Sequence, residues 1–220
     1  MRPSEPECGD RRARNEYTTV LLSGVRNSPL EKPAAFRRLL EEKTVVMPGA
    51  FNAAIGMLAE SMGFEAIYIS GAGIINGTTG YPDIALLGVE EVARAAAYIA
   101  NAVGVPALCD ADTGFGEALQ VMRTVQVFEA AGVAGIHLED QVMPKRCGHL
   151  AGKYCLPVEE AILKLKAALD ARSDPDFFII ARTDAASAVG GGMADAIERS
   201  KRYADAGADA SAKLFGRDVR

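Results

Sequence analysis

The sequence predicts an α/β protein in which parallel strands alternate with helices, arranged as a barrel or as a doubly wound sheet. From Ala34 onward, short β-branched or apolar runs alternate with helical stretches, which is typical of βαβ units. Within the helical stretches, apolar residues recur on one face, as at Val121, Val125 and Phe128. Several stretches end in a glycine before the next apolar run, for example Gly132, and glycine is favoured where a helix ends.

About five β/α units can be placed along the chain. Strands are expected at residues 45–47, 66–70, 105–110, 135–139 and 177–183, where apolar and β-branched residues cluster. Helices are expected at residues 53–62, 90–101, 118–131, 158–171 and 193–206. A sixth strand should begin near Ala208, but the residues from Ser211 to Arg220 do not continue the pattern. The repeat is therefore expected to stop after about five units.

The length of 220 residues predicts one compact domain with appendages, since two ordinary domains need a longer chain. With 49% hydrophobic and 24% charged residues, the composition is that of a globular protein with a sizeable core. Residues 1–33 contain four prolines and mixed charges, which predicts a flexible N-terminal extension. Residues 34–210 are expected to form the main domain, and residues 211–220 a divergent C-terminal tail.

Charge and hydropathy argue against two classes of partner. The formal net charge is −5 and no basic run is longer than Arg11-Arg12, so no nucleic-acid partner is expected. No stretch approaches the roughly 18 apolar residues of a membrane span, and the N-terminus is polar, so we expect a cytoplasmic protein without membrane contact. The four cysteines show no CxxC spacing, which predicts reduced thiols rather than a disulfide framework.

Acidic residues follow three of the predicted strands. Asp110 and Asp112 end the third, Glu139 and Asp140 the fourth, and Asp184 the fifth. In parallel α/β folds the loops after the strand ends build the active site, so these carboxylates should meet at one rim. Such a cluster needs a cation, and all-oxygen ligands suit Mg²⁺ or Mn²⁺ better than zinc. The alternative is that single aspartates only cap the helices that follow them.

One cysteine lies in a basic, glycine-containing loop after the fourth strand. Cys147 is flanked by Lys145, Arg146 and His149, and nearby positive charge favours a thiolate, so it is a candidate acid, base or nucleophile. Zinc binding by Cys147 and His149 is a competing interpretation, but the chain offers no second matching pair of ligands. His137 either lies beside the acidic cluster or is a hydrogen-bonded core residue.

Five motifs occur in order at the ends of the predicted strands. They are Ser70-Gly71, Tyr81-Pro82-Asp83, Asp110-Ala111-Asp112-Thr113-Gly114, Glu139-Asp140-Gln141 and Lys145-Arg146-Cys147-Gly148-His149. With these motifs the sequence resembles, from about residue 36 to residue 210, the isocitrate lyase and phosphoenolpyruvate mutase superfamily. Members that act on phosphorus–carbon bonds typically carry Asn in place of Cys147, and the long isocitrate lyases have an insertion for which this chain has no room. The sequence is therefore most similar to the short carbon–carbon lyases, first 2-methylisocitrate lyase, then 2,3-dimethylmalate lyase or oxaloacetate hydrolase.

The resemblance implies a (β/α)8 TIM-type barrel that is truncated here after about five units. It also implies a Mg²⁺ site, with Mn²⁺ as a possible substitute. Asp110 and Asp112 would bind the metal directly or through water, and Asp83 and Glu139 would orient those waters from the outer shell. The family further implies a small-molecule carboxylate as substrate and a homo-oligomer, which is a tetramer in the complete form.

The substrate site is carried over from the same resemblance. Ser70, Gly71 and Ala72 would hold one substrate carboxylate, although the family often has Gly where Ala72 stands. Arg182 would bind another carboxylate through its planar fork, which Lys could not do. Tyr68 is the family-like candidate for handling the proton of the substrate hydroxyl.

The implied reaction breaks a carbon–carbon bond in a 2-hydroxy di- or tricarboxylic acid by retro-aldol, Claisen-type chemistry. Cys147 would protonate the carbanion that results, while Lys145 and His149 would stabilise negative charge and tune the thiol. From 2-methylisocitrate the products would be pyruvate and succinate. Decarboxylation or hydrolysis of oxaloacetate is a second enzymatic alternative.

The family's last three β/α units have no counterpart in this sequence, so two further interpretations stay open. The chain could be an inactive binding or regulatory remnant, or a fragment of a longer gene product. Open strand edges also predict that the chain alone associates or aggregates.

Overall fold

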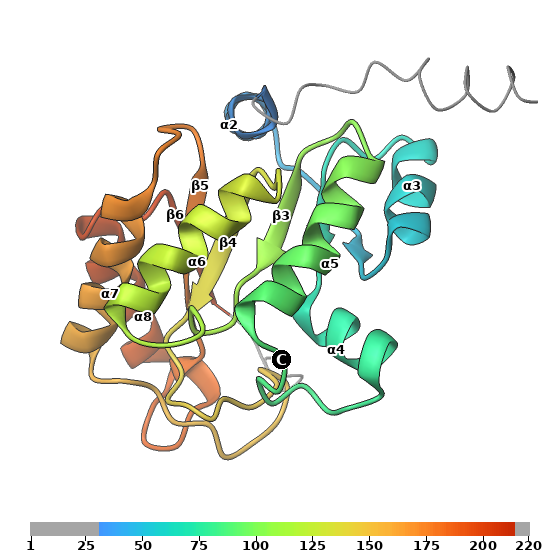
Figure 1. The fold of residues 1–220 in the computed structure, drawn as a ribbon. Helices are drawn as coiled ribbons and strands as arrows, with labels where there is room; N and C mark the ends of the chain where they lie inside the picture. Colours follow the sequence, from blue (N-terminus) through green and yellow to red (C-terminus); the bar gives the residue numbers. More distant parts are fainter. Residues whose placement is uncertain (1–30, 214–220) are drawn as a thin grey trace, which may run out of the picture.

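The computed structural model describes residues 31–213, which form one curved parallel sheet with helices on its outer surface (Figure 1). The six strands are neighbours in sequence order, and every pair is parallel. They are β1 (Gly49–Ala50), β2 (Ile67–Ile69), β3 (Ala107–Asp110), β4 (Gly135–Glu139), β5 (Phe178–Thr183) and β6 (Ala210–Lys213). This order and curvature are those of part of a β/α barrel, as the sequence predicts.

Helices connect the successive strands, and five of them lie within two residues of their predicted bounds. These are α3 (Ala53–Ser61), α5 (Val89–Ala102), α6 (Ala118–Ala130), α7 (Val158–Ala171) and α8 (Met193–Asp205). The sequence does not predict two further helices, α2 (Lys32–Glu42) and α4 (Gly71–Thr79), and a 3-10 turn, η2, covers Ala185–Ser187. Among the described helices, none combines the length and apolar composition that a membrane span requires.

The first strand lies later than predicted. The sequence predicts pairing at residues 45–47, but the ladder begins only where Pro48 O accepts from Tyr68 N at 3.0 Å, and β1 is Gly49–Ala50. Proline has no amide hydrogen to give to a ladder, so pairing starts at Pro48 and not before it. Val45 and Met47 are instead partly buried against a small apolar cluster that contains Phe36 and Phe178.

The sixth strand corrects the expected end of the repeat. The sequence assigns residues 211–213 to a divergent tail, but they continue β6, which pairs with β5 from Ala210 to Lys213. Their sequence is not strand-like, and the pairing is carried by main-chain hydrogen bonds with β5, whose register begins at Ile180 opposite Ala210. The other end differs too, because α2 begins at Lys32, inside the expected extension. Residues 1–30 and 214–220 of the expected extension and tail lie outside the described residues.

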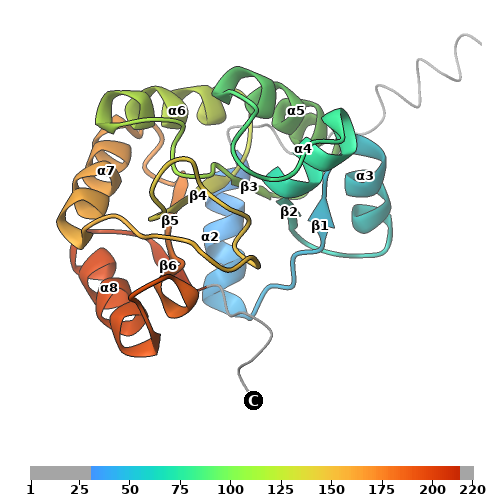
Figure 2. The same cartoon turned by 90° about the horizontal axis from the view of Figure 1, so that it is seen from below.

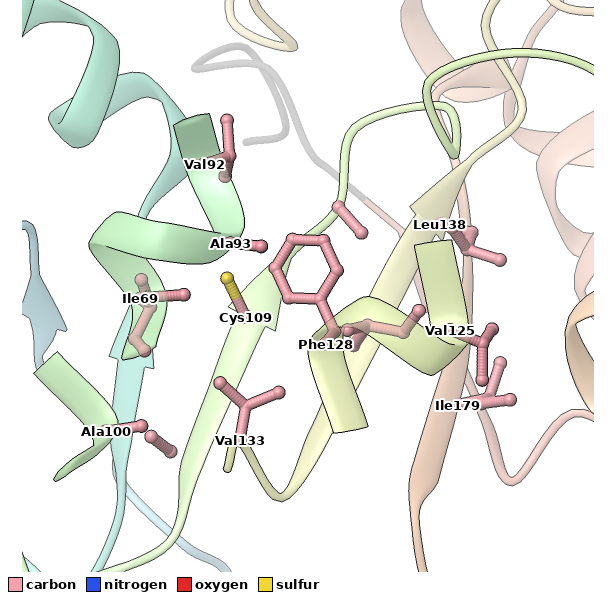
Figure 3. Close-up of a cluster of buried hydrophobic side chains, with 14 of the residues drawn as sticks. Ile69, Val92, Ala93, Ala100, Cys109, Val125, Phe128, Val133, Leu138 and Ile179 are labelled. Atoms are coloured by element: carbon pink, nitrogen blue, oxygen red, sulfur yellow. The ribbon is translucent and has the colours of Figure 1, made fainter. Parts of the chain in front are cut away.

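The larger core lies between the sheet and its outer helices. In Figure 3 the Phe128 ring of α6 lies beside Cys109 of β3 and Val133, with Ala93 of α5 nearby. These four side chains are at most 4% exposed. Cys109 is a buried free cysteine within this core. Phe128 and its neighbours on α6 thus fix this helix to the sheet through the apolar face seen in the sequence.

A smaller core lies on the inner side of the sheet and is closed by α2. The ring of Phe36 packs edge-to-face on Phe178 at a centroid distance of 5.2 Å. Lys32 Nζ donates to Ala100 O at 2.6 Å and to Val103 O at 3.0 Å, which ties α2 to the end of α5. In Figure 2, which views the molecule from below, α2 lies inside the arc of strands. The strands' opposite, carboxyl ends remain open to the loops that carry the candidate site.

Gly135 offers a direct test of the contact between β4 and β5. A Cβ at this position would lie 2.2 Å from Phe178 O, so a side chain would force β4 away from β5. We expect Gly135→Ala to lower the free energy of unfolding by at least about 2 kcal/mol, measured by urea titration. Gly49→Ala is the matched control, because nothing lies within 4 Å of its added Cβ. Equal effects of the two substitutions would contradict the tight β4–β5 contact.

Candidate active site

Most of the predicted site residues line one cavity of about 150 Å³ at the carboxyl ends of the strands. Its lining comes from the ends of β2 to β5 and from the loops that follow them: Tyr68, Ser70, Ala72, Asp83, Asp110, Glu139, Cys147, Gly148, His149 and Arg182. Gly71, Asp112 and Lys145, also predicted, do not line the cavity. They contact residues close to it, as the next paragraphs describe.

Three buried carboxylates form the acidic centre of the site. Asp110 ends β3, Asp112 follows it, and Glu139 ends β4; oxygens of all three lie within 4.8 Å of one another. Gly71 leaves room for this cluster, because a Cβ there would lie 3.0 Å from Asp110 Oδ2. The spacing suits a divalent cation held by oxygen ligands.

Asp112 is held in an unfavourable conformation for a residue with a side chain. Its φ is +47°, and its amide donates to Asp110 Oδ1 at 3.0 Å, so the turn folds back on the first carboxylate. Its Oδ1 is buried and lies 2.5 Å from Lys145 Nζ. Burial, followed by the charge of Asp110, raises the pKa of Asp112 to about 6. An ionised carboxylate has several acceptor sites, so Asp112 can bind a metal cation in addition to Lys145.

The surrounding charges also leave room for a cation. Five buried carboxylates share the region with three buried cationic side chains: Asp83, Asp110, Asp112, Glu139 and Asp184 with Lys145, Lys153 and Arg182. Burial raises the pKa of Glu139 well above its ordinary value, despite the opposing charge of Arg182. For Asp110 burial acts in the same direction, but the charge and hydrogen bond of His137 outweigh it and lower the pKa. A divalent ion would balance the excess of negative charge.

Lys145 lies between two carboxylates rather than beside the thiol alone. Its Nζ is 2.6 Å from Asp83 Oδ1 and 2.5 Å from Asp112 Oδ1, and the residue is 1% exposed. Burial would lower the pKa of Lys145, but Asp112 and the other carboxylates raise it above its ordinary value. Asp83 therefore reaches the acidic centre through Lys145 and lies outside the group of three.

Arg182 connects the cavity to two acids. Its NH1 lies 2.6 Å from Glu139 Oε1, and its NH2 lies 3.2 Å from both oxygens of Asp184. Burial would lower the pKa of Arg182, but Glu139 and Asp184 raise it, so the guanidinium is charged. A cationic fork fixed in this way can bind a substrate carboxylate.

Tyr68 and His137 form a chain to the acidic centre. The Tyr68 hydroxyl lies 2.6 Å from His137 Nε2, and the same nitrogen lies 3.0 Å from Asp110 Oδ1. Burial, followed by the charge of Asp110, raises the pKa of Tyr68 far above its ordinary value. The hydroxyl therefore keeps its proton at neutral pH. His137, for which the sequence leaves two interpretations open, belongs to the surroundings of the acidic cluster.

The start of α4 faces the cavity from another side. Ser70 caps this helix, with its hydroxyl oxygen accepting from Gly73 N at 3.1 Å. The first amides of a helix have no partner within it and favour anions, so Gly71 and Ala72 can present N–H groups to a carboxylate. The glycines and threonines of this segment are poor helix formers, which explains why the sequence does not predict α4.

Cys147 is half-buried at the cavity wall, and His149 is exposed but also lines it. Asp140, expected at the same rim, instead belongs to the packing of α8. It accepts from Thr183 Oγ1 at 2.7 Å, Tyr203 OH at 2.8 Å and Arg199 NH1 at 3.2 Å. The sequence pattern thus assigns Asp140 to the site, whereas the structure places it in the contacts with α8.

Two buried polar residues beside the cavity, Gln141 and Lys153, receive no role in the sequence analysis, although Gln141 belongs to the Glu139-Asp140-Gln141 motif. Gln141 follows the end of β4, and Lys153 lies in the basic loop. Their burial, 1% exposed each, has no signal in composition or spacing. Only the path of the loop turns these side chains inward.

The comparisons with known proteins agree with this geometry. The family described as phosphoenolpyruvate phosphomutase matches residues 36–215. The chain is 49% identical to 2-methylisocitrate lyase of Aeropyrum pernix over 82% of its own length, and 49% identical to 2,3-dimethylmalate lyase of Eubacterium barkeri over 80%. It spans 58% and 61% of the lengths of these relatives.

Solved structures give the same result. Oxaloacetate acetylhydrolase in complex with 3,3-difluorooxalacetate matches with a TM-score of 0.82 and 36% identity, over 87% of this chain and 66% of that one. Phosphonopyruvate hydrolase in complex with oxalate and Mg²⁺ matches with a TM-score of 0.77 and 34% identity, over 86% and 64%. The sheet order, the family match and these identities lead to one conclusion: the chain belongs to the phosphoenolpyruvate phosphomutase family, within the PEP mutase/isocitrate lyase superfamily.

Proposed function

We propose that this chain carries the active site of a magnesium-dependent carbon–carbon lyase. Its substrate would be a 2-hydroxy di- or tricarboxylate, with 2-methylisocitrate as the first candidate, giving pyruvate and succinate. One observation carries the proposal: Cys147 lines the same cavity as Asp110, Glu139, Ser70 and Arg182. A proton donor, acidic ligands and two carboxylate-binding groups are the parts that such a cleavage needs.

The metal would be held by Asp110, Asp112 and Glu139. Their converging oxygens and the excess of buried negative charge fit a hard divalent ion, Mg²⁺ or Mn²⁺. The identity of the metal is supported by the Mg²⁺ in the related phosphonopyruvate hydrolase complex. When bound, the ion would act as a Lewis acid toward the substrate's oxygen atoms.

The chain's own groups would bind and orient the substrate. Ser70 and the first amides of α4 would hold one carboxylate, and the Arg182 guanidinium the other. The raised pKa of Tyr68 supports a role as a neutral hydrogen-bond partner of the substrate hydroxyl, not as a phenolate base.

Cleavage moves the electron pair of the breaking carbon–carbon bond onto the carbon next to a carboxylate. The substrate hydroxyl gives its proton to solvent water and becomes the carbonyl of pyruvate. Cys147 would then give the Sγ–H proton to the carbanion, and a proton from solvent would restore the thiol. Lys145, fixed between Asp83 and Asp112, and His149 at the cavity mouth would stabilise negative charge.

Two sibling reactions are also supported by the comparisons. The 49% identity to a 2,3-dimethylmalate lyase supports cleavage of 2,3-dimethylmalate as an alternative. The similarity to the structure of oxaloacetate acetylhydrolase supports hydrolysis of oxaloacetate. An inactive binding or regulatory protein is the contrasting possibility carried over from the sequence.

A substrate panel separates these proposals. The purified chain with Mg²⁺ is incubated with each acid, and products are identified by mass spectrometry. We expect pyruvate and succinate in equal amounts from 2-methylisocitrate. Pyruvate with propionate from 2,3-dimethylmalate, or oxalate with acetate from oxaloacetate, would reassign the substrate. A folded chain that binds Mg²⁺ but converts none of the three would contradict the lyase proposal.

Assembly and location stay predictions from the sequence. We propose a homo-oligomer that acts on a small-molecule carboxylate in the cytoplasm. Sedimentation velocity tests the first part, with a monomer over the whole concentration range as the contradicting result.

Metal binding should depend on pH through Asp112. The fold raises the pKa of Asp112 from 3.8 to about 6. Ionisation of this group therefore lowers the free energy of unfolding, and the loss develops as the pH rises from about 3.8 to about 6. Mg²⁺ needs the ionised form and should recover that stability. We therefore expect a larger Mg²⁺-induced rise of Tm above pH 7 than at pH 5, measured by differential scanning fluorimetry. A shift of equal size at both pH values would contradict a carboxylate with a raised pKa in the metal site.

A further inference from the structure

The loop that carries Cys147 is held by buried side chains for which the proposed reaction has no use. An antiparallel bridge between Gln141 and Cys155 closes the loop at its base. Gln141, Lys153 and Asp184 lie against the loop and are at most 1% exposed. Each makes hydrogen bonds or an ion pair that involve the loop, the acidic centre or each other.

The Gln141 side chain hydrogen-bonds to both backbone groups of Arg146, the residue that precedes Cys147. The Gln141 Oε1 accepts from Arg146 N at 3.0 Å, and its Nε2 donates to Arg146 O at 2.9 Å. The same Nε2 lies 3.0 Å from Glu139 Oε2 in the acidic centre. One side chain therefore connects the peptide before the thiol to a proposed metal ligand.

Lys153 holds the residue that follows Cys147. Its Nζ donates to Gly148 O and, at 2.8 Å, to Ser187 Oγ in η2. The ammonium lies 3.9 Å from Asp184 Oδ1, which balances its charge. A buried lysine is costly unless it is paired and hydrogen-bonded, so this one is committed to the loop.

Asp184 connects Gln141 with Lys153. Its Oδ2 accepts from Gln141 Nε2 at 2.7 Å, while Arg182 NH2 reaches both of its oxygens at 3.2 Å. The carboxylate is thus shared by Gln141, Lys153 and the proposed substrate-binding arginine. Movement at any of them would be transmitted to the others through one buried group.

We propose that Gln141, Lys153 and Asp184 form a loop clamp that fixes the peptides on both sides of Cys147 and so positions its thiol at the cavity. They are positioning residues, since none of them lines the cavity. The inference rests on the proposed role of Cys147 as proton donor. A proton donor has to stay within hydrogen-bond reach of the reacting carbon, and small displacements are costly in rate.

Two variants of the full chain test the clamp from opposite sides. Gln141→Leu removes the amide at similar volume and unchanged charge, and Lys153→Met removes the ammonium but keeps the stem. The readouts are the rate of Cys147 alkylation by iodoacetamide, resolved by peptide mass spectrometry, and amide hydrogen exchange over residues 142–152. Val125→Ala, a substitution in the α6 core, is the control for general destabilisation.

We expect both rates to rise about ten-fold in each clamp variant, because lost hydrogen bonds free the loop locally, and to stay near wild type in Val125→Ala. Where the wild-type chain turns over substrate, kcat should fall with KM nearly unchanged, as expected for a misplaced donor in a site that still binds. Unchanged alkylation and exchange in both variants, or an equal rise in Val125→Ala, would overturn the clamp.

These readouts separate the clamp from the proposed function. A wild-type chain without lyase activity would refute the function, yet loop loosening confined to the two variants would still support the clamp. Lyase activity in the wild type combined with an unaltered loop in both variants would refute the clamp and leave the proposed function supported.

Discussion

Cys147→Ser is expected to lower lyase kcat by at least about 100-fold while Mg²⁺ affinity stays unchanged. The thiol lines the cavity, but it is not among the acidic side chains that converge on the proposed metal site. A serine hydroxyl is a much weaker acid at the same position, so it should bind substrate without protonating the carbanion. Initial rates of pyruvate release measure the first effect, and calorimetric Mg²⁺ titration measures the second.

Cys155→Ser is the matched control for this substitution. Cys155 is half-buried and does not line the cavity, and burial raises the pKa of its thiol. Activity should stay close to wild type in this variant. Full turnover by Cys147→Ser, or equal losses in both variants, would refute the assignment of Cys147 as the acid.

Asp112→Ala is expected to reduce Mg²⁺ affinity by more than about 100-fold, since even residues outside the first coordination shell typically contribute 10- to 100-fold. The substitution removes one of three converging carboxylates and one of the two carboxylates that pair with Lys145 Nζ, while Asp83 remains. Lyase activity should be lost and should return poorly with excess Mg²⁺. Titration with Mn²⁺, followed by electron paramagnetic resonance, measures the affinity directly.

Glu159→Ala controls for the loss of an acid elsewhere. Its side chain is exposed at the start of α7 and forms an ion pair with Arg202 on the surface. Its Mn²⁺ affinity should equal that of the wild type. If Asp112→Ala also bound Mn²⁺ normally, the acidic centre would be a structural cluster rather than a metal site.

Much of the fold follows from local patterns in the sequence. The apolar face at Val121, Val125 and Phe128 marks α6, because burial of a periodic pattern fixes this helix. The strand β4 lies at the predicted residues 135–139, and all five of its residues are buried. The errors arise where the backbone overrides side-chain pattern. Strand pairing begins only at Pro48, later than predicted. The glycine-rich α4 forms with Ser70 as its N-cap although its residues have low helix propensity.

The candidate site is predictable from the sequence to the extent that parallel strands end at one rim. That rule brings Asp110 and Glu139 into one cavity with Cys147, as their positions after successive strands indicate. It does not tell which way a loop side chain turns. The inward path of Lys153 and the diversion of Asp140 into the α8 contacts depend on tertiary packing that no spacing reveals.

Metal-dependent product formation tests the central claim most directly. The purified 220-residue chain is given 2-methylisocitrate, first with Mg²⁺, then after removal of the metal by EDTA, and finally after Mg²⁺ is restored. We predict equimolar pyruvate and succinate with the metal, none after chelation, and recovery on restoration. Product formation that persists without metal, or none from a folded chain that binds Mg²⁺, would contradict a lyase site built on Asp110, Asp112, Glu139 and Cys147.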